Sequence, residues 1–260
     1  MKKERTVTMN KNDIKIKEYS SSNEKSIRKN ILKLFRECPL PDNELLSNLG
    51  LFINRQNLSN MLFKQELYSK IIEQHGVIME FGVRWGQNLA LFASLRGIYE
   101  PFNHNRKIIG FDTFEGFPNI HDKDGESDII KKGSFNVTMK YEEYLADILD
   151  YHERESPISH IKKYEIIKGD ANIEIEKYFN EHPETIVALA YFDFDIYEPT
   201  KRGLELIRNH ITKGTVIGFD ELNHHDFPGE TVALKEVFEI KELKIKRTPY
   251  SGSSSYIIIE

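Results

Sequence analysis

Hydrophobic and polar positions follow a regular alternation from Val77 to the end of the chain. Short apolar runs of strand length are separated by longer stretches in which apolar residues recur every three to four positions. The short runs predict strands at 77–81, 107–111, 164–168, 186–192, 214–219, 243–247 and 254–259. The longer stretches predict helices at 87–97, 171–181, 198–210 and 229–239. Strands that alternate with helices in this way indicate a doubly wound, mostly parallel sheet.

The C-terminal end departs from the parallel pattern. Only Thr248 to Ser253 lies between the last two predicted strands. A connection this short joins antiparallel neighbours, because a parallel pair needs a long crossover segment. The sequence therefore predicts an α/β fold with a doubly wound, Rossmann-like sheet of seven strands, mostly parallel and closed by an antiparallel pair.

Two helical segments precede this alternating region. Apolar residues recur at helical spacing over 24–37 and again over 57–74. Residues 1–23 are polar, with clusters of lysine and serine, which is typical of a flexible tail. The predicted organisation is this tail, an N-terminal helical extension at 24–75 and a main domain at 76–260.

A long polar segment interrupts the main domain after its second strand. Residues 113–160 are rich in polar residues, contain glycines and prolines, and include one predicted helix at 140–152. An insertion of this length is often a lid or a substrate loop. A lid over the site and a surface excursion without function are both open alternatives.

Composition narrows the possible partners. The 260 residues carry a net charge of -5, so the chain lacks the basic footprint of a nucleic-acid-binding protein. It has no apolar run of the roughly 18 residues that cross a membrane, and its basic start lacks the apolar core of a secretory signal. Cys38 is the single cysteine, which excludes an internal disulfide and a cysteine-cluster metal site. We predict a soluble cytoplasmic protein whose partner is neither a nucleic acid nor a membrane.

A glycine turn follows the first predicted strand. Glu80 ends the apolar run, Gly82 and Gly86 follow, and an amphipathic run begins near Gln87. This order predicts a strand, a turn and a helix whose first N–H groups point at a ligand. The spacing differs from the G-x-G-x-x-G of dinucleotide folds, and an acid beside the turn would repel a pyrophosphate. It suits a ligand with a cationic part, such as S-adenosylmethionine, although an ordinary turn is the alternative.

Acidic residues stand at or just beyond the ends of five successive predicted strands. They are Glu80, Asp112, Asp170, the pair Asp193 and Asp195, and the pair Asp220 and Glu221. The C-terminal ends of parallel strands line the ligand crevice of such a sheet. Position predicts that Asp112 accepts hydrogen bonds from ribose hydroxyls, that Asp170 lies near the adenine, and that Asp193 joins the cofactor site. Turn and helix-cap roles are the alternatives for Asp112 and Asp170.

The acids at the fourth and fifth of these strand ends form a candidate metal site. Asp193 and Asp195 are two residues apart after an apolar strand, so a continuing strand would point both to the same side. Asp220 and Glu221 end the neighbouring strand, and clustered carboxylates suit a hard cation such as Mg²⁺. His224 and His225 follow as a base, a metal ligand or solvated loop residues; His224 is the second catalytic candidate beside Asp195.

These segments resemble the macrocin O-methyltransferase family, which comprises S-adenosylmethionine-dependent methyltransferases that act on sugar hydroxyls. The resemblance spans about Val77 to Phe238 and rests on four segments: Glu80–Asn88, Gly110–Pro118, Asp193–Thr200 and Gly218–Glu221, followed by Pro228-Gly229. It implies a class I methyltransferase fold and a Mg²⁺ ion held by Asp195, Asp220 and Glu221. The family usually has two aspartates at the last pair, so Glu221 is a departure.

The convergence of Asp195, Asp220 and Glu221 on adjacent strand ends leads to a hypothesis for the mechanism, and the resemblance implies an acceptor class. Mg²⁺ would orient a sugar hydroxyl and lower its pKa, and Asp195 would accept the proton. The acceptor is expected to be a glycan, a nucleotide sugar or a glycosylated natural product. Family members are often homo-oligomers, although no residue pattern here shows one. A metal-dependent nucleotide-sugar glycosyltransferase, suggested by the D-x-D of Asp193 and Asp195, and a non-catalytic cofactor-binding protein are the alternatives.

Overall fold

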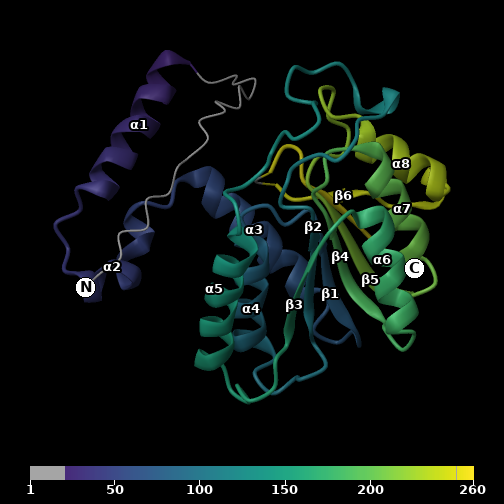
Figure 1. Cartoon of the computed structure of the whole chain (residues 1–260), viewed down its shortest axis with the longest axis horizontal. Helices are drawn as coiled ribbons and strands as arrows, with labels where there is room; N and C mark the ends of the chain where they lie inside the picture. The colour runs from purple at the N-terminus through teal and green to yellow at the C-terminus, as the bar shows by residue number, and fades with distance from the viewer. Residues whose placement is uncertain (1–20, 250) are drawn as a thin grey trace.

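The computed structural model describes residues 21–249 and 251–260 (Figure 1). Residues 1–20 of the predicted tail therefore lie outside the described part. The remainder of that tail is already ordered as helix, because α1 begins at Ser22 and Ser21 is its N-cap. The Ser21 side chain accepts a hydrogen bond from the backbone N–H of Glu24, while the Glu24 carboxylate accepts from that of Ser21. This capping box satisfies two of the free N–H groups at the helix start.

A seven-stranded sheet forms the centre of the molecule. Its strands are β1 (Val77–Phe81), β2 (Ile108–Asp112), β3 (Tyr164–Lys168), β4 (Val187–Phe192), β5 (Ile211–Phe219), β6 (Lys246–Arg247) and β7 (Ser255–Ile258). They lie in the order β3-β2-β1-β4-β5-β7-β6. The first five are parallel, and β7 pairs antiparallel with both β5 and β6. The predicted fold class is confirmed.

Eight α-helices and three short 3-10 helices are found in the described residues. The α-helices are α1 (Ser22–Arg36), α2 (Asp42–Leu45), α3 (Arg55–Ser69), α4 (Gln87–Tyr99), α5 (Tyr141–Glu155), α6 (Ala171–Glu181), α7 (Tyr197–Ile207) and α8 (Gly229–Val237). The 3-10 helices are η1 (Leu46–Leu51), η2 (Asp122–Asp124) and η3 (Ile240–Glu242). In this part of the chain no helix is long and apolar enough to cross a lipid bilayer.

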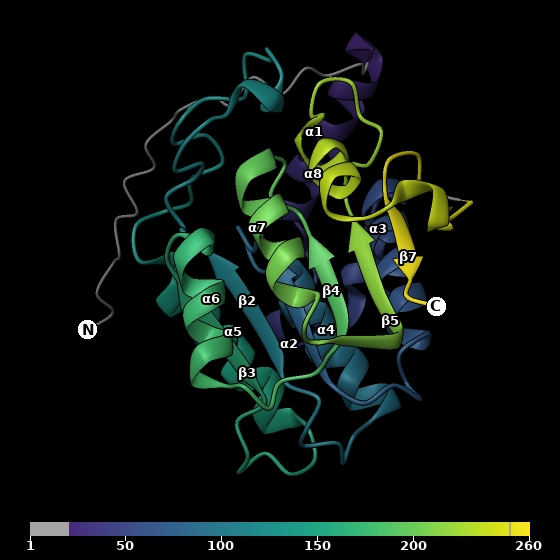
Figure 2. The ribbon, with the colours of Figure 1, turned by 90° about the vertical axis from the view of Figure 1, so that its right-hand side faces the viewer.

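Helices cover both faces of the sheet. Figure 2 shows α6, α7 and α8 on one face, and α3, α4 and α5 pack on the other. Successive strand residues supply the two cores in turn: Met79 and Phe81 face α6–α8, whereas Ile78 faces α3–α5. Burial on both faces explains why the strands read as unbroken apolar runs.

A row of four phenylalanines crosses the sheet at one level. Phe111, Phe81, Phe192 and Phe219 are the paired residues near the C-terminal ends of β2, β1, β4 and β5, and all four are fully buried. Neighbouring rings stack with centroids 5.4, 4.5 and 5.6 Å apart. The row fixes the relative register of the four strand ends, since a shift of one residue would move a ring to the opposite face.

Three regions differ in detail from the sequence prediction. Helix α2 and η1 were not predicted, because a proline-flanked stretch of only ten residues, Asp42 to Leu51, is too short to show helical periodicity. Strand β6 is reduced to two residues, because residues 243–245 of the predicted strand have no regular structure. Strand β5 begins earlier than expected, at Ile211.

The segment at 113–160 has two structurally distinct parts. Helix α5, at its C-terminal end, packs Leu145 and Leu149 into the core and serves as the crossover between β2 and β3. The chain before it has little regular structure beyond η2. The excursion from the domain core is therefore confined to about residues 113–140.

We expect Phe192→Ala to lower the free energy of unfolding by about 3–5 kcal/mol, because it empties a site between two stacked rings. Equilibrium denaturation in urea would measure the loss. Phe192→Leu keeps most of the buried volume and should cost clearly less. Equal losses for the two variants would show that ring stacking at this position contributes little.

Candidate active site

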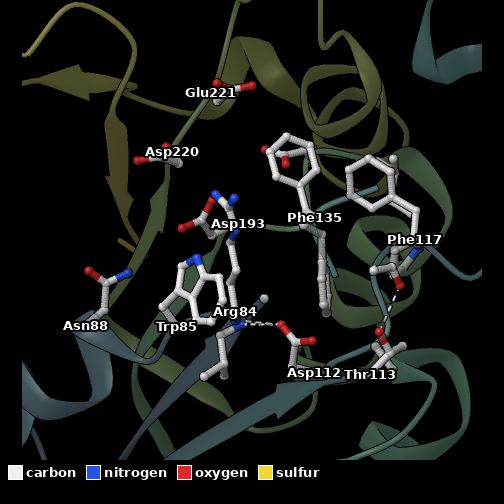
Figure 3. Close-up of a pocket in the computed structure, with 18 of the residues that line it drawn as sticks. Arg84, Trp85, Asn88, Asp112, Thr113, Phe117, Phe135, Asp193, Asp220 and Glu221 are labelled. Carbon is white, nitrogen blue, oxygen red and sulfur yellow. Dashed lines mark hydrogen bonds between the residues drawn. The ribbon is translucent and has the colours of Figure 1, made fainter. Parts of the chain in front are cut away.

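A cavity of about 420 Å³ opens at the C-terminal edge of the parallel strands. Its walls come from the turn after β1, the ends of β2, β4 and β5, the excursion at 113–140, and helix α3. Figure 3 shows Asp220 and Glu221 on one side of this space and the rings of Phe117 and Phe135 on the other, with Asp193 and Arg84 between them. A concave site at this edge is where doubly wound sheets bind their ligands.

The structure brings most of the predicted site residues together. Eight of them line the cavity: Gly82, Gly86, Asp112, Asp170, Asp193, Asp195, Asp220 and Glu221. They belong to five different strand–helix connections, so only the tertiary structure makes them neighbours. The shared level of the phenylalanine row explains this, because Gly82, Asp112, Asp193 and Asp220 each follow one of the four rings directly.

Two predicted residues lie beside the cavity instead of lining it. Glu80 is fully buried beneath the glycine turn, where its Oε1 accepts a hydrogen bond of 2.8 Å from Asn88 Nδ2 and its Oε2 has no partner. Burial raises the pKa of Glu80, and the charge of Asp193 adds to the shift. The ring of His224 packs 5.5 Å from that of Phe227, a cavity residue, and its Nδ1 is buried without a partner. The base role of His224 stays a prediction.

The glycine turn requires both of its glycines. Gly82 has φ +94°, and a Cβ there would stand 2.1 Å from the carbonyl oxygen of Asp193. Gly86 has φ +72°, caps the start of α4, and would place a Cβ 2.3 Å from the side chain of Leu145. The turn therefore lies directly against the end of β4, and the first residues of α4, Gln87 and Asn88, line the cavity.

Asp112 holds the glycine turn in place. Its Oδ2 accepts hydrogen bonds of 2.7 Å from the N–H groups of Val83 and Arg84, and its Oδ1 accepts one of 2.6 Å from Phe114. Arg84 adopts φ +48°, a strained conformation that these bonds support. The predicted contact between Asp112 and a ribose stays a prediction, although the residue lies at the position expected for it.

Asp170 has the helix-cap role that was one of its two alternatives. Its Oδ1 accepts a hydrogen bond of 3.0 Å from the backbone N–H of Asn172 at the start of α6. It also lines the cavity, so the cap does not exclude a ligand contact.

Asp193 and Asp195 reach the cavity by a different route from the one expected. Strand β4 ends at Phe192, and Asp195 adopts φ +62°. Strand alternation therefore does not apply to this pair, and the prediction that it sets their direction was wrong. The left-handed residue takes the backbone out of the strand conformation, and both residues still line the cavity.

The carboxylates around the cavity raise one another's pKa. Burial and then the charges of Asp220 and Asp195 raise the pKa of Asp193; burial and then Glu221 and Asp220 raise that of Asp195. Burial, followed by Asp220 and Asp193, raises the pKa of Glu221 to about 8. The site therefore holds more negative charge than its own cations balance.

Glu230 belongs to this acidic group but was not predicted. It lies at the start of α8, is fully buried, and has its pKa raised by burial and by Asp195. Its Oε2 accepts a long hydrogen bond of 3.4 Å from the N–H of Glu221, while its Oε1 has no partner. An acid in the first turn of a helix looks like an ordinary dipole partner in sequence, which is why it was missed.

A buried lysine from the N-terminal extension meets the acidic group. Lys64 of α3 is 2% exposed, and its Nζ lies 2.7 Å from the hydroxyl of Tyr191 and 3.8 Å from Asp220 Oδ1. The Tyr191 hydroxyl donates to the same Asp220 oxygen at 2.8 Å. Lys64 lies on the face of α3 that also carries Asn60 and the buried Leu67. A lysine on the apolar face of a predicted helix was the signal in the sequence that could have identified it.

Arg84 supplies a second positive charge from the glycine turn. Its guanidinium carbon lies 4.8 Å from the ring centroid of Phe135, and its Nε is buried without a hydrogen-bond partner. Figure 3 shows the side chain reaching across the cavity toward Asp193. Its charge lowers the pKa of Asp193 and Asp195, against the larger effect of burial.

The donor chemistry fits a divalent cation, although the side chains do not yet converge. Glu221 Oε2 and Glu230 Oε1 are buried carboxylate oxygens without partners, and oxygen ligands of this kind suit Mg²⁺. Asp220 Oδ1, in contrast, already accepts from Tyr191 and Ser254. Between Ser21 and Glu260, residue 250 aside, no three acids, histidines or cysteines form a ready metal site. Rotation of these side chains is needed before they can hold an ion.

Comparison with solved structures identifies relatives of the whole chain. The structure of CalS11, a calicheamicin methyltransferase, is 39% identical and has a TM-score of 0.90, covering 93% of this chain and 94% of CalS11. This chain belongs to the same methyltransferase family as CalS11. No family model and no curated protein matches the chain.

Two further structures extend the comparison. An apo structure of CalS11, a TDP-rhamnose 3′-O-methyltransferase, is 36% identical over 93% of this chain and 96% of that one, with a TM-score of 0.82. The O-methyltransferase NovP covers 77% of this chain and 79% of its own at 14% identity and a TM-score of 0.55, which shows a shared fold. The chain is an S-adenosylmethionine-dependent methyltransferase, as the sequence predicted.

We expect Gly82→Ala to weaken binding of S-adenosylmethionine by more than about tenfold and to lower stability by at least about 1–3 kcal/mol. The new Cβ would collide with the Asp193 carbonyl and displace the turn. Isothermal calorimetry and thermal unfolding would measure the two effects. Gly50→Ala is the control, because a Cβ at Gly50 meets nothing within 4 Å. Unchanged binding in Gly82→Ala would remove the turn from the cofactor site.

Proposed function

We propose that this methyltransferase transfers a methyl group to a hydroxyl of a nucleotide-linked sugar. The observation that carries the proposal is the 36–39% identity to CalS11 along nearly the whole length of both chains. CalS11 is a TDP-rhamnose 3′-O-methyltransferase. The resemblance to macrocin O-methyltransferases supports the same acceptor class, and the narrower assignment to that family stays a prediction.

The glycine-turn side of the cavity is the proposed cofactor site. Bound S-adenosylmethionine supplies a methyl group on a positively charged sulfur. Gly82 and Gly86 leave room for a ligand against the backbone, and the α4 N-terminus offers free N–H groups. The unpartnered Oε2 of Glu80, close beneath the turn, provides an acceptor without a donor. The surrounding carboxylates favour a cationic ligand, because the positive side chains of the site do not balance their charge.

The opposite side of the cavity is the proposed acceptor site. Asn60 and Lys64 of α3 lie there with Asp220 and Glu221. Polar side chains that converge on one wall suit a hydroxyl-rich sugar, and the aromatic wall of Phe117 and Phe135 suits flatter apolar groups. The excursion at 113–140 supplies those two rings, which supports the lid alternative for this segment.

Asp195 is the proposed catalytic base. It lines the cavity and lies close enough to Glu221 and Asp220, the acids after β5, for their charges to raise its pKa. Its carboxylate takes the proton from the acceptor hydroxyl, and the oxygen then receives the methyl group in an in-line displacement. Lys64 and Tyr191 fix the carboxylate of Asp220 beside it, so that Asp220 keeps one orientation.

Mg²⁺ is the proposed metal, held by Asp195, Asp220 and Glu221. A bound divalent cation lowers the pKa of a coordinated hydroxyl. It would also balance the excess of carboxylates that raises the pKa of Glu221. Glu230 is a candidate fourth ligand because its free oxygen belongs to the same acidic group.

Methyl transfer is favoured over the two alternatives considered from the sequence. A glycosyltransferase built around Asp193 and Asp195 does not account for the identity with CalS11. A non-catalytic cofactor-binding protein would not need Asp193, Asp195, Asp220 and Glu221 around one cavity, since burying several like charges destabilises the fold.

The decisive assay is transfer of a radiolabelled methyl group to TDP-rhamnose. We expect turnover with wild-type enzyme and a fall in kcat of roughly 10²–10⁴-fold in Asp195→Asn, with cofactor affinity unchanged. Free rhamnose, tested in parallel, shows whether the nucleotide is needed. Full turnover in Asp195→Asn would exclude it as the base, and no transfer to any sugar nucleotide would overturn the acceptor class.

The raised carboxylate pKa values predict an unusual pH dependence for metal-free enzyme. The pKa of Glu221 rises from 4.5 to about 8 on folding, so its stabilising contribution is complete below about 4.5 and disappears as the pH rises through 8. In the presence of chelator, the thermal unfolding midpoint should therefore decrease as the pH rises from about 4.5 to 8. Added Mg²⁺ should raise the midpoint most at the alkaline end of this range. Glu221→Gln should flatten this dependence. A thermal midpoint that changes neither with pH nor on addition of Mg²⁺ would contradict metal binding at Glu221.

A further inference from the structure

Helix α1 has no residue buried in the structure, yet one of its faces is apolar. Ile27, Ile31 and Leu34 recur at helical spacing, and Ile27 and Leu34 are 56% and 63% exposed. A helix of 15 residues is marginal in water unless its apolar face packs against another surface. The helix therefore needs a partner surface.

The helix projects from the main domain, as Figure 1 shows. Phe35, near its C-terminal end, meets the ring of Phe52 at 5.0 Å and anchors that end to its own extension. The stripe of Ile27, Ile31 and Leu34 remains outside this contact. Further apolar side chains of the extension, including Leu46 and Leu51 of η1, are also exposed. The unpartnered surface thus continues beyond α1.

Helix α5 has an outer face of matching length. The side of α5 that faces away from the core carries Tyr144, Ile148 and Tyr151 at the same helical spacing. The opposite side packs Leu145 and Leu149 into the core. Tyr144 and Tyr151 are 56% and 69% exposed. Amphipathic tyrosines are enriched in protein interfaces, because their rings pack while their hydroxyls stay hydrogen-bonded.

The two helices carry opposite charge. Helix α1 has five basic residues, namely Lys25, Arg28, Lys29, Lys33 and Arg36, against the single acid Glu24. Helix α5 has six acids against the single cation Arg154. Glu153 is buried and paired with Arg96 and Lys163, so the negative charge of its outer surface comes from Glu142, Glu143, Asp147, Asp150 and Glu155. Opposite charge favours pairing of α1 with α5 and disfavours pairing of two α1 helices, because like charges repel.

We propose that α1 of one copy packs along the outer face of α5 of a second copy. A two-fold arrangement makes the contact twice, so that each subunit gives one helix and receives one. Helix α1 continues through α2 and η1 into α3, which carries Asn60 and Lys64 in the cavity wall. In the dimer, α3 would be held by its packing on the sheet and also, through η1 and α2, by the contact of α1 with the second copy.

The test is the oligomeric state of the full chain by sedimentation equilibrium. We expect a dimer for the wild type and a dissociation constant raised about a hundredfold or more in Ile27→Ser/Leu34→Ser and in Tyr144→Ser/Tyr151→Ser. The mutated side chains are exposed, so folding should be unaffected, and circular dichroism would verify this. Leu32→Ser is the matched control, because Leu32 is 47% exposed on the other side of α1.

A cross-link distinguishes the proposed pairing from other contacts. In a Cys38→Ser background, Leu34→Cys in one preparation and Tyr151→Cys in another should form a mixed disulfide dimer on mixing. A monomeric wild type, or a dimer that survives both double-serine variants, would overturn the proposal. So would a monomer that co-sediments through α1 with vesicles containing phosphatidylserine, since basic amphipathic helices also bind anionic membranes.

Discussion

The stacked row of Phe111, Phe81, Phe192 and Phe219 is the constraint on which the rest of the site depends. Four large rings buried at one level leave no freedom of register between the central strands. The residue after each ring, whether glycine or aspartate, therefore emerges at the same height on the sheet edge. Hydrogen bonds between these emerging residues and the neighbouring strands continue the ladder into the site, as from Asp193 N–H to the Phe81 carbonyl at 2.8 Å.

The electrostatics of the site are the consequence of that alignment. Carboxylates delivered to one edge repel one another, and burial raises their pKa values further. The protein offsets part of this with Lys64 and Arg84, which come from outside the sheet. The remaining imbalance favours cationic ligands, because a positively charged cofactor or a metal ion offsets the repulsion between the carboxylates. Ligand affinity and fold stability are thus linked through the same side chains.

The parts of the N-terminal extension before and after η1 have different roles. Helix α3 is part of the domain, with Phe63, Leu67, Tyr68 and Ile71 in the core and Lys64 at the site. Helix α1 contributes nothing to that core. A single connected extension thus joins the cavity wall to an apolar surface that faces away from the domain.

The sequence by itself determined the order and type of the main elements, the antiparallel end of the sheet and most of the acids at the site. These follow from local periodicity and from the rule that parallel strands end at one edge. Only the tertiary structure decided the direction of Asp195, since a left-handed φ is not encoded by strand alternation. It alone also brought Lys64 and Arg84 to the cavity and Glu230 to the acidic group beside it. Their roles depend on which distant charges they meet, and that is set by packing between elements far apart in the chain.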